Sequence, residues 1–266
     1  MSMEKKPQTA ETNSRLWGAR ADDWANIQEG TVLPVYKAVY DRIGLSAGAS
    51  HLDAGCGAGM AAQVASERGA FVSGLDAAES LLAIARTRVP NGEFHEGELE
   101  NLPFPDGSFD LVTGFNSFQY AGNPGVALAE AKRVARKGAD VVIMTWGEPE
   151  GMEAAALISA IKPLLPAPPP GTAGPFALSN EGALRQFASS ADLAPVEVFD
   201  VASPWHYPDM ATALRGLKSA GVAIRAIEHT SEAAVDSAYS EAVEPFRQTD
   251  GTYLIDATFR CLVARA

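Results

Sequence analysis

The chain has 266 residues, a length that fits one large α/β domain with an elaboration and allows a substantial core. Hydrophobic residues make up 47% of the chain and charged residues 20%, which is ordinary for a folded globular protein. The formal net charge of −12 argues against a nucleic-acid substrate, because neutralising phosphates requires clustered Lys and Arg.

Two further features bear on where the protein works. Residues 1–15 are polar and lack an apolar stretch, so we expect a disordered tail rather than a signal peptide. No apolar run approaches the roughly 20 residues of a membrane-spanning helix, and membrane insertion is not expected. We expect the two cysteines, Cys56 and Cys261, to be reduced thiols in a cytoplasmic protein.

The first half of the chain alternates strand and helix patterns. Residues 15–44 carry apolar and aromatic side chains at helical intervals, which predicts two helices before the first strand. Strands are then predicted at 50–53, 71–75, 93–96, 109–115 and 140–146, with helices between them at 58–68, 79–88 and 124–136. This alternation predicts a doubly wound parallel α/β sheet. The basic residues Lys132, Arg133, Arg136 and Lys137 are interpreted as a solvated helix face.

After Trp146 the pattern changes. The predicted elements are helices at 151–165, 181–190, 210–220 and 232–246, and strands at 196–202 and 253–264, with a proline-rich segment at 166–171. We expect a cofactor-binding core at 16–147, completed by 179–204 and 252–266. Two insertions, 148–178 and 205–251, are expected to form a lid that carries substrate contacts.

The most informative stretch is residues 51–60, which read His-Leu-Asp-Ala-Gly-Cys-Gly-Ala-Gly-Met. Glycines in a turn between a strand and a helix allow the backbone to approach a ligand closely. The spacing is G-x-G-x-G, whereas the dinucleotide fingerprint is G-x-G-x-x-G, whose third glycine falls on Met60. The turn therefore predicts a nucleotide-type ligand other than a nicotinamide cofactor.

Three blocks in this order resemble the class I S-adenosylmethionine-dependent methyltransferases. They are residues 53–59, residues 71–76 with the terminal acid Asp76, and residues 97–112. Within that family the chain resembles the type 11 group, typified by ubiquinone/menaquinone-biosynthesis methyltransferases, over roughly residues 45–146. The resemblance implies a Rossmann-like, mostly parallel seven-stranded sheet, S-adenosyl-L-methionine as cofactor and S-adenosyl-L-homocysteine as product.

The resemblance also implies roles for particular residues. Asp76 would accept both ribose hydroxyls, although it could instead cap the helix that begins near Ala78. Asp53 would hold the ammonium group of the cofactor or tie down the turn's own amides. Glu98 and Leu99 would contact the adenine, and Phe115 and Asn116 the methionine moiety. The full set of expected cofactor-binding residues is Asp53, Gly55, Cys56, Gly57, Gly59, Asp76, Ala77, Glu98, Leu99, Phe115, Asn116, Trp24 and Tyr36.

Methyl transfer from a sulfonium depends mostly on alignment, and a general base helps only where the nucleophile must lose a proton. The candidate catalytic residues are His206, in the second insertion, and Tyr120. His206 could equally be a surface or packing residue, and His51 and His95 are expected to be structural. Aromatic residues such as Trp17, Trp24 and Tyr36 could enclose the site or simply pack the core. No metal site is predicted, because no His, Cys or acidic cluster has ligand-like spacing.

We therefore expect methyl transfer to O, N or C of a small apolar or aromatic metabolite, without nucleic-acid partners. The oligomeric state is left open. A non-catalytic or regulatory S-adenosylmethionine-binding protein with the same fold is the alternative, and a nicotinamide-dependent dehydrogenase is disfavoured by Met60.

Overall fold

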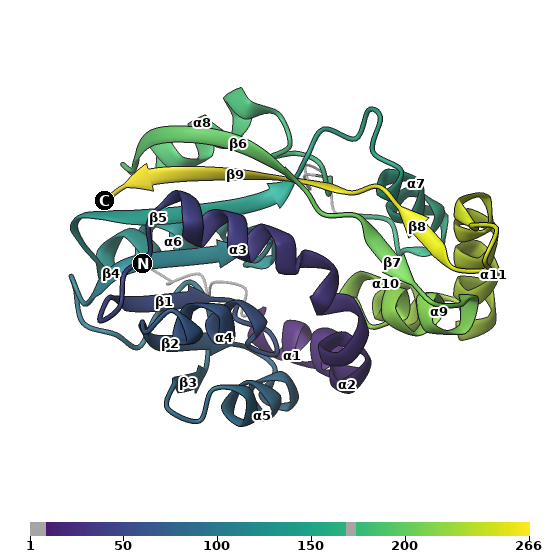
Figure 1. Cartoon of the computed structure of the whole chain (residues 1–266), viewed down its shortest axis with the longest axis horizontal. Coiled ribbons are helices and arrows are strands. Elements are labelled where there is room, and N and C mark those ends of the chain that lie inside the picture. Colours follow the sequence, from purple (N-terminus) through teal and green to yellow (C-terminus); the bar gives the residue numbers. More distant parts are fainter. Residues whose placement is uncertain (1–8, 169–173) are drawn as a thin grey trace, which may run out of the picture.

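The computed structural model describes residues 9–168 and 174–266. Seven strands form one sheet in the order β3-β2-β1-β4-β5-β9-β6 (Figure 1). The strands are β1 Ser50–Ala54, β2 Phe71–Asp76, β3 Glu93–Glu96, β4 Phe109–Phe115, β5 Ala135–Trp146, β6 Ala194–Ala202 and β9 Thr258–Arg265. β9 pairs antiparallel with both β5 and β6, and the pairs among β1 to β5 are parallel. The expected doubly wound, mostly parallel seven-stranded sheet is confirmed.

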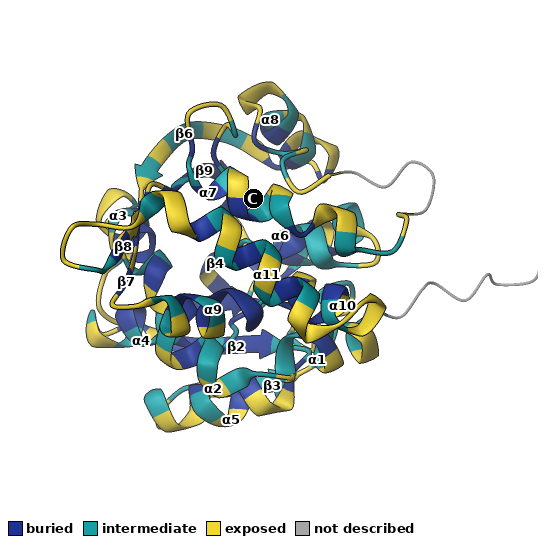
Figure 2. Ribbon diagram, turned by 90° about the vertical axis from the view of Figure 1, so that its right-hand side faces the viewer, coloured by how far each residue is buried: buried dark blue, intermediate teal, exposed yellow. Residues whose placement is uncertain are grey.

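Helices cover both faces of the sheet, and the sheet separates two hydrophobic cores. One face packs against α3 Leu33–Arg42, α4 Met60–Glu67 and α5 Glu79–Arg88, and the other against α6 Pro124–Val134 and α8 Glu181–Ser190. The buried strands β2 and β4 lie between these layers in Figure 2. Alternation along β5 sends Val142 and Met144 into the first core and Val141 and Ile143 into the second. Because β5 is buried on both faces, its sequence is a nearly continuous run of apolar residues.

A second group of elements gathers beyond the carboxyl ends of the parallel strands (Figure 1). It contains α7 Ala154–Ala160, α9 Met210–Lys218, α10 Gly221–His229 and α11 Glu232–Val243, with a small antiparallel sheet of β7 Trp205–Tyr207 and β8 Tyr253–Ile255. The N-terminal helices α1 Ala10–Gly18 and α2 Ala21–Asp23 lie at the same end. A π-helical turn, Trp24–Gln28, and a 3-10 turn, Glu29–Val32, connect α2 to α3.

Several boundaries differ from the sequence predictions. The predicted tail at 1–15 is wrong for residues 10–15, which lie in α1, while residues 1–8 fall outside the described residues. The final strand splits into β8 and β9 because its first part pairs with β7, a strand that was not predicted. The helix predicted at 151–165 ends at Ala160, and Pro163 follows in a 3-10 turn. Part of the proline-rich segment, residues 169–171, is outside the described residues.

The basic cluster at the end of α6 is also reassigned. Arg136 and Lys137 belong to β5 rather than to a helix, because α6 ends at Val134. Arg133 is only partly exposed, and its guanidinium binds the loop that follows β3. Within the described residues, no helix is both long and apolar enough to cross a membrane.

Candidate active site

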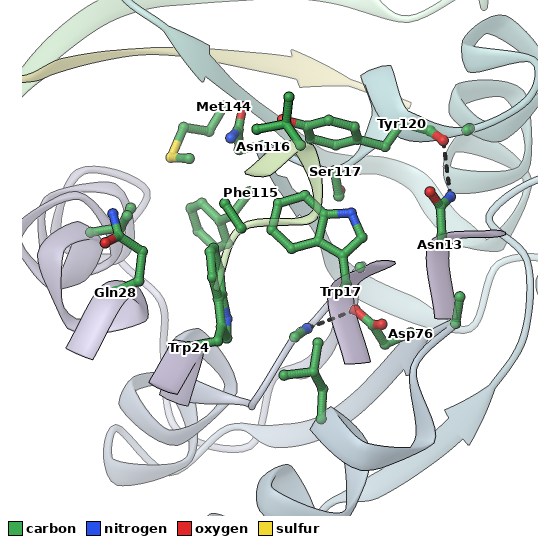
Figure 3. A pocket seen from close by; sticks show the side chains of 18 of the residues that line it. Asn13, Trp17, Trp24, Gln28, Asp76, Phe115, Asn116, Ser117, Tyr120 and Met144 are labelled. Atoms are coloured by element: carbon green, nitrogen blue, oxygen red, sulfur yellow. Dashed lines mark hydrogen bonds between the residues drawn. The ribbon is translucent and has the colours of Figure 1, made fainter. Parts of the chain in front are cut away.

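A cavity opens at the carboxyl edge of the sheet, between the strand ends and the second group of elements (Figure 3). Its floor comes from the turn after β1, the end of β2 and the loop after β4. Its other walls come from α1, the Trp24–Val32 turns, α7, and α9 to α11. Open α/β sheets bind their ligands at this edge.

The glycine turn after β1 adopts backbone conformations that side chains resist. Gly55, Gly57 and Gly59 have φ values of +81°, +53° and +83°. A Cβ on Gly55 would lie 2.4 Å from that of Ser117, and one on Gly59 would lie 2.8 Å from that of Ala85. The positive φ angles favour glycine at all three positions. The loop after β4 lies too close to Gly55, and α5 too close to Gly59, for a side chain to fit. Gly55 and Gly57 line the cavity, while Gly59 allows Ala85 of α5 to approach the start of α4 closely.

Asp76, at the end of β2, fastens two turns together at the cavity wall. Its Oδ2 accepts from the Gly57 amide and its Oδ1 from the Ala78 amide, each at 2.9 Å. Each carboxylate oxygen keeps a lone pair for a ligand. Burial raises the pKa of Asp76, while these backbone bonds oppose the shift. Asp76 is not the N-cap of α5, which is Ala78, so the helix-cap alternative is wrong, and the ribose contact stays a prediction.

The other predicted cofactor residues lie on neighbouring loops. Ala77, Glu98, Leu99, Phe115 and Asn116 all line the cavity. Glu98 Oε1 accepts a hydrogen bond of 3.3 Å from the first amide of α1, so that helix begins directly at the expected adenine edge. Asn116 has a left-handed φ of 55°, and its backbone amide donates to the Met144 carbonyl at 3.1 Å.

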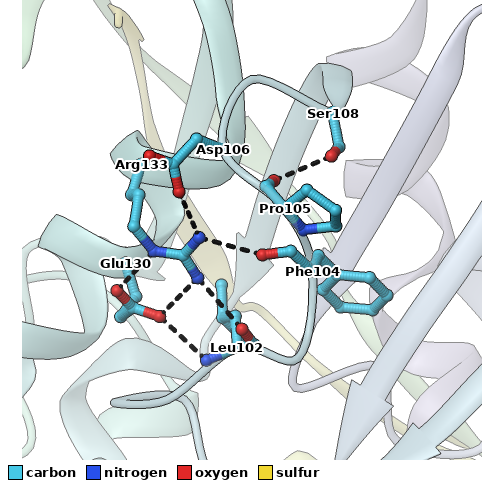
Figure 4. A network of polar contacts seen from close by, with 7 residues as sticks. All are labelled: Leu102, Phe104, Pro105, Asp106, Ser108, Glu130 and Arg133. Carbon is cyan, nitrogen blue, oxygen red and sulfur yellow. Dashed lines mark hydrogen bonds and ion pairs between the residues drawn. The ribbon is translucent and has the colours of Figure 1, made fainter.

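An arginine on α6 holds the loop that carries Glu98. Arg133 donates to the carbonyls of Leu102 and Phe104 at 3.0 and 2.9 Å and pairs with Glu130 and Asp106 (Figure 4). Glu130 in turn accepts from the Leu102 amide, and Arg133 lowers its pKa. These contacts fix the chain between β3 and β4 and hence the position of the loop.

Three of the predicted residues, Asp53, Cys56 and Gly59, do not line the cavity. Asp53 is buried within the sheet, where its carboxylate accepts from Thr113 Oγ1 at 2.8 Å. Thr113 Oγ1 also lies 2.9 Å from His51 Nε2. Burial raises the pKa of Asp53 to about 7 and lowers that of His51 to about 3. Cys56 is buried beneath the turn, and both cysteines are free thiols, as expected.

Aromatic rings close the cavity above Asp76. Trp17 packs edge-on between Trp24 and Tyr120, with ring centroids 5.1 and 5.3 Å apart (Figure 3). Tyr36 packs on Phe115 at 4.8 Å. The buried Trp24 Nε1 has no hydrogen-bond partner in the described part of the chain and lies 3.4 Å from where a Gly57 Cβ would stand. Burial raises the pKa of Tyr120 to about 12, so its hydroxyl remains protonated at neutral pH.

The structure places His206 away from the cavity. Its side chain is exposed on β7, while the adjacent Trp205 and Tyr207 point inward and are buried. Strand alternation explains this, because a residue between two inward-facing neighbours faces outward. No histidine is among the described residues that line the cavity, so His206 is not assigned a role as general base.

One buried ion pair, between Glu29 and Arg88, was not predicted from the sequence. Glu29 is 2% exposed and pairs with Arg88 of α5, and its Oε1 accepts from the Met60 amide at 3.3 Å. Arg88 also donates to the Ala58 carbonyl at 3.0 Å. The pair thus fixes the Trp24–Val32 turns to the glycine turn. Burial raises the pKa of Glu29 and Arg88 opposes the shift.

The fold and this site define an open α/β domain whose cavity lies across the ends of β1, β2 and β4. Residues 52–143 match the family of methyltransferase domains. A malonyl-[acyl-carrier protein] O-methyltransferase from Serratia marcescens is 36% identical over 106 residues, which cover 38% of this chain and 42% of that protein. A demethylmenaquinone methyltransferase from Renibacterium salmoninarum is 32% identical over 111 residues, with 42% and 47% covered.

Solved structures share the fold. An S-adenosylmethionine-dependent methyltransferase from Aquifex aeolicus has a TM-score of 0.53 at 22% identity, covering 68% of this chain and 92% of that one. The [4+2]-cyclase SpnF has a TM-score of 0.59 at 18% identity, with 97% and 93% covered. At these identities the likeness establishes the fold alone.

Residues 52–143 therefore match a methyltransferase domain, and the relatives that share this stretch include methyltransferases that depend on S-adenosylmethionine. The chain spans about half the length of the curated relatives it matches, from 42% to 61% among the first three. The cofactor of this class is S-adenosyl-L-methionine. The residues present fit it: the turn leaves open backbone at Gly57, Asp76 has spare lone pairs, and Trp24 offers a buried N–H.

Proposed function

We propose that the chain transfers the methyl group of S-adenosyl-L-methionine to a small, uncharged, apolar or aromatic molecule held in the same cavity. The observation that carries this proposal is the distribution of charge on the walls. The charged side chains that line the cavity within the described residues are Asp76, Glu98 and Glu100, all acidic and all near the ends of β2 and β3.

The opposite end of the cavity is aromatic and aliphatic. Its walls include Trp146, Leu157, Trp205, Leu217 and Phe259. No Lys, Arg or His from the described part of the chain lines it, so an acceptor carboxylate or phosphate would lose water without gaining a cation. An uncharged acceptor avoids this cost and gains from burial of its apolar surface.

When bound, S-adenosyl-L-methionine supplies an electrophilic methyl group on a positively charged sulfur. We assign to this chain the tasks of holding and aligning. Asp76 would accept from the ribose hydroxyls, the glycine turn and Trp24 would face the methionine end, and the rings would exclude water. Tyr120 would act as a hydrogen-bond donor at neutral pH, because a hydroxyl with a pKa of about 12 is a poor base there.

The experiment that tests the function is transfer of a labelled methyl group. The protein, S-adenosyl-L-methionine labelled in its methyl group and a small-molecule extract are incubated, and labelled products are separated by chromatography. We expect label in an uncharged small molecule together with formation of S-adenosyl-L-homocysteine. Tight cofactor binding without any transfer would instead support the non-catalytic alternative.

A substitution tests the cofactor assignment independently of the acceptor. Asp76→Ala should weaken S-adenosyl-L-methionine binding by about 1.5–3 kcal/mol, the cost of losing a charged hydrogen-bond partner. Asp41→Ala is the matched control, because this acid is 73% exposed on α3 and lies outside the cavity. Calorimetric titration in which both variants bind like the unaltered protein would refute the ribose contact.

A further inference from the structure

The apolar end of the cavity contains two polar side chains, each with a hydrogen-bond donor that has no partner among the described residues. Gln28, the last residue of the π-helical turn, is 7% exposed, and Tyr239, on the inner face of α11, is 4% exposed. Both line the cavity. Figure 3 shows Gln28 on the side of the cavity opposite Asn13 and Tyr120.

The oxygen of the Gln28 side-chain amide faces Tyr207 and α9. Tyr207 donates its hydroxyl proton to Gln28 Oε1 at 2.8 Å. A Cβ on Gly216 of α9 would lie 2.9 Å from the same oxygen, so the backbone of α9 encloses that side. The Nε2 atom, which carries two protons, has no hydrogen-bond partner in residues 9–168 and 174–266.

The Tyr239 hydroxyl belongs to a second buried polar side chain that lines the same cavity. Tyr239 makes no hydrogen bond to any other described residue. The Tyr239 hydroxyl and Gln28 Nε2 both keep some accessible surface. In residues this deeply buried, that surface faces the cavity they line.

Unpaired buried donors carry a cost, which a ligand that supplies an acceptor removes. We propose that Gln28 Nε2 and the Tyr239 hydroxyl together bind an oxygen atom of the methyl acceptor. The acceptor is then an apolar or aromatic molecule with a carbonyl or phenolic oxygen, oriented by these two donors. The inference rests on the proposed function, because it assigns the substrate class of the same cavity.

The test compares two probes of matched shape, 1-tetralone, which has one carbonyl oxygen, and tetralin, which has none. Binding to the full chain saturated with S-adenosyl-L-homocysteine is followed by tryptophan fluorescence. All four tryptophans of the chain, Trp17, Trp24, Trp146 and Trp205, line the cavity and report on it. We expect the unaltered protein to bind 1-tetralone about threefold to tenfold more tightly than tetralin, as one or two neutral hydrogen bonds allow.

Tyr239→Phe and Gln28→Leu should each reduce this preference towards one, with S-adenosyl-L-homocysteine affinity unchanged. Gln28→Leu also deprives Tyr207 of its partner, so Tyr239→Phe is the cleaner variant. Tyr40→Phe is the matched control. Its hydroxyl donates to the Ala61 carbonyl at 3.2 Å outside the cavity, so it should lower stability and keep the preference.

Equal affinity of the unaltered protein for both probes, or a preference that survives Tyr239→Phe, would overturn the assignment. Failure of the proposed function appears elsewhere, as absent binding of S-adenosyl-L-homocysteine. If S-adenosyl-L-homocysteine does not bind, 1-tetralone and tetralin are compared on the protein alone. The assignment then still requires tighter binding of 1-tetralone, and loss of that preference in Tyr239→Phe.

Discussion

At the scale of single residues, the buried row His51, Thr113 and Asp53 has consequences for pH. Both ionisable groups are nearly inaccessible, at 0% and 1% exposure, and they are joined through the Thr113 hydroxyl. Burial disfavours the charged form of each. The folded state therefore holds the Asp53 proton tightly and the His51 proton loosely.

The two groups change stability in opposite directions over the same pH range. The pKa of Asp53 rises from 3.8 to about 7, so its contribution favours the folded state at low pH and is lost as pH rises through 7. The pKa of His51 falls from 6.5 to about 3, so its contribution is present above pH 6.5 and is lost as pH falls towards 3. Between pH 5 and 7 the two effects partly cancel.

Removing one group at a time should expose the other. As the pH falls from 7 to 5, the free energy of unfolding of Asp53→Asn should decrease relative to that of the unaltered protein. That of His51→Leu should increase over the same interval. Urea unfolding at both pH values measures each free energy, and the shared contributions of other groups cancel in the comparison. Two variants with the same pH slope would contradict this account.

Residue positions were predictable from the sequence where a motif ties a side chain to the end of a strand. Asp76 and Glu98 are such residues, and both line the cavity. Gln28, Glu29 and Tyr239 lie in segments whose pattern shows only apolar periodicity, so nothing in the sequence marked their inward direction. His206 was ambiguous for a related reason: without a predicted strand at β7, the face it occupies was unknown.

At the scale of elements, the glycine turn positions α4 and α5 as well as a ligand. Gly59 is the N-cap of α4 in the left-handed region, and Ala85 of α5 packs directly on it. A side chain there meets two penalties, the backbone conformation and the contact with α5. Gly107 has a similar φ of +62° but open space around its missing side chain.

These two glycines form a matched pair for substitution. Gly107→Ala should cost about 1–2 kcal/mol, the strain of a left-handed alanine. Gly59→Ala should cost at least about 2 kcal/mol more, because α5 must shift from its place. Denaturant unfolding of both variants provides the measurement. A Gly59 variant no less stable than the Gly107 variant would show that α5 yields without cost.

The elements of the sheet were largely predictable because alternating strands and helices leave a clear hydrophobic period. The elements beyond Trp146 were less so. The helix predicted at 210–220 corresponds to α9, which ends at Lys218, but the helix that follows it, α10 at Gly221–His229, was not predicted. The pairing of β7 with β8 joins residues about 50 positions apart, a distance at which local patterns carry no information.

At the scale of the whole molecule, the N-terminal helices and the α9–α11 group meet above the cavity. Arg15 pairs with Glu228, Arg20 with Glu232, and Arg215 with Asp23. Trp17 packs against Gly221, where a Cβ would lie 2.9 Å away. Exposed pairs of this kind contribute little each and are weakened by salt. The closure is therefore held mainly by apolar packing over a site that ligands must enter.

We expect α1 and the α9–α11 group to open and close as ligands bind. Amide hydrogen exchange in α1 and α10 should be faster than in β4 and β5, and 1 M salt should accelerate it further in these helices alone. S-adenosyl-L-homocysteine should slow exchange at residues 55–59, in α1 and around Asp76 and Glu98. Full protection of residues 205–208 should require 1-tetralone as well, because the second molecule fills the other end of the cavity.

The alternative is a rigid enclosure. If α1 and α10 exchange as slowly as the central strands, with and without both molecules and at either salt concentration, the helices are a fixed wall. Entry would then depend on side-chain rearrangement alone, and Trp17 is the group best placed for it, since it lies between Trp24, Tyr120 and Gly221. Trp17→Ala would in that case speed cofactor association while leaving helix exchange unchanged, whereas in an opening enclosure it should speed both.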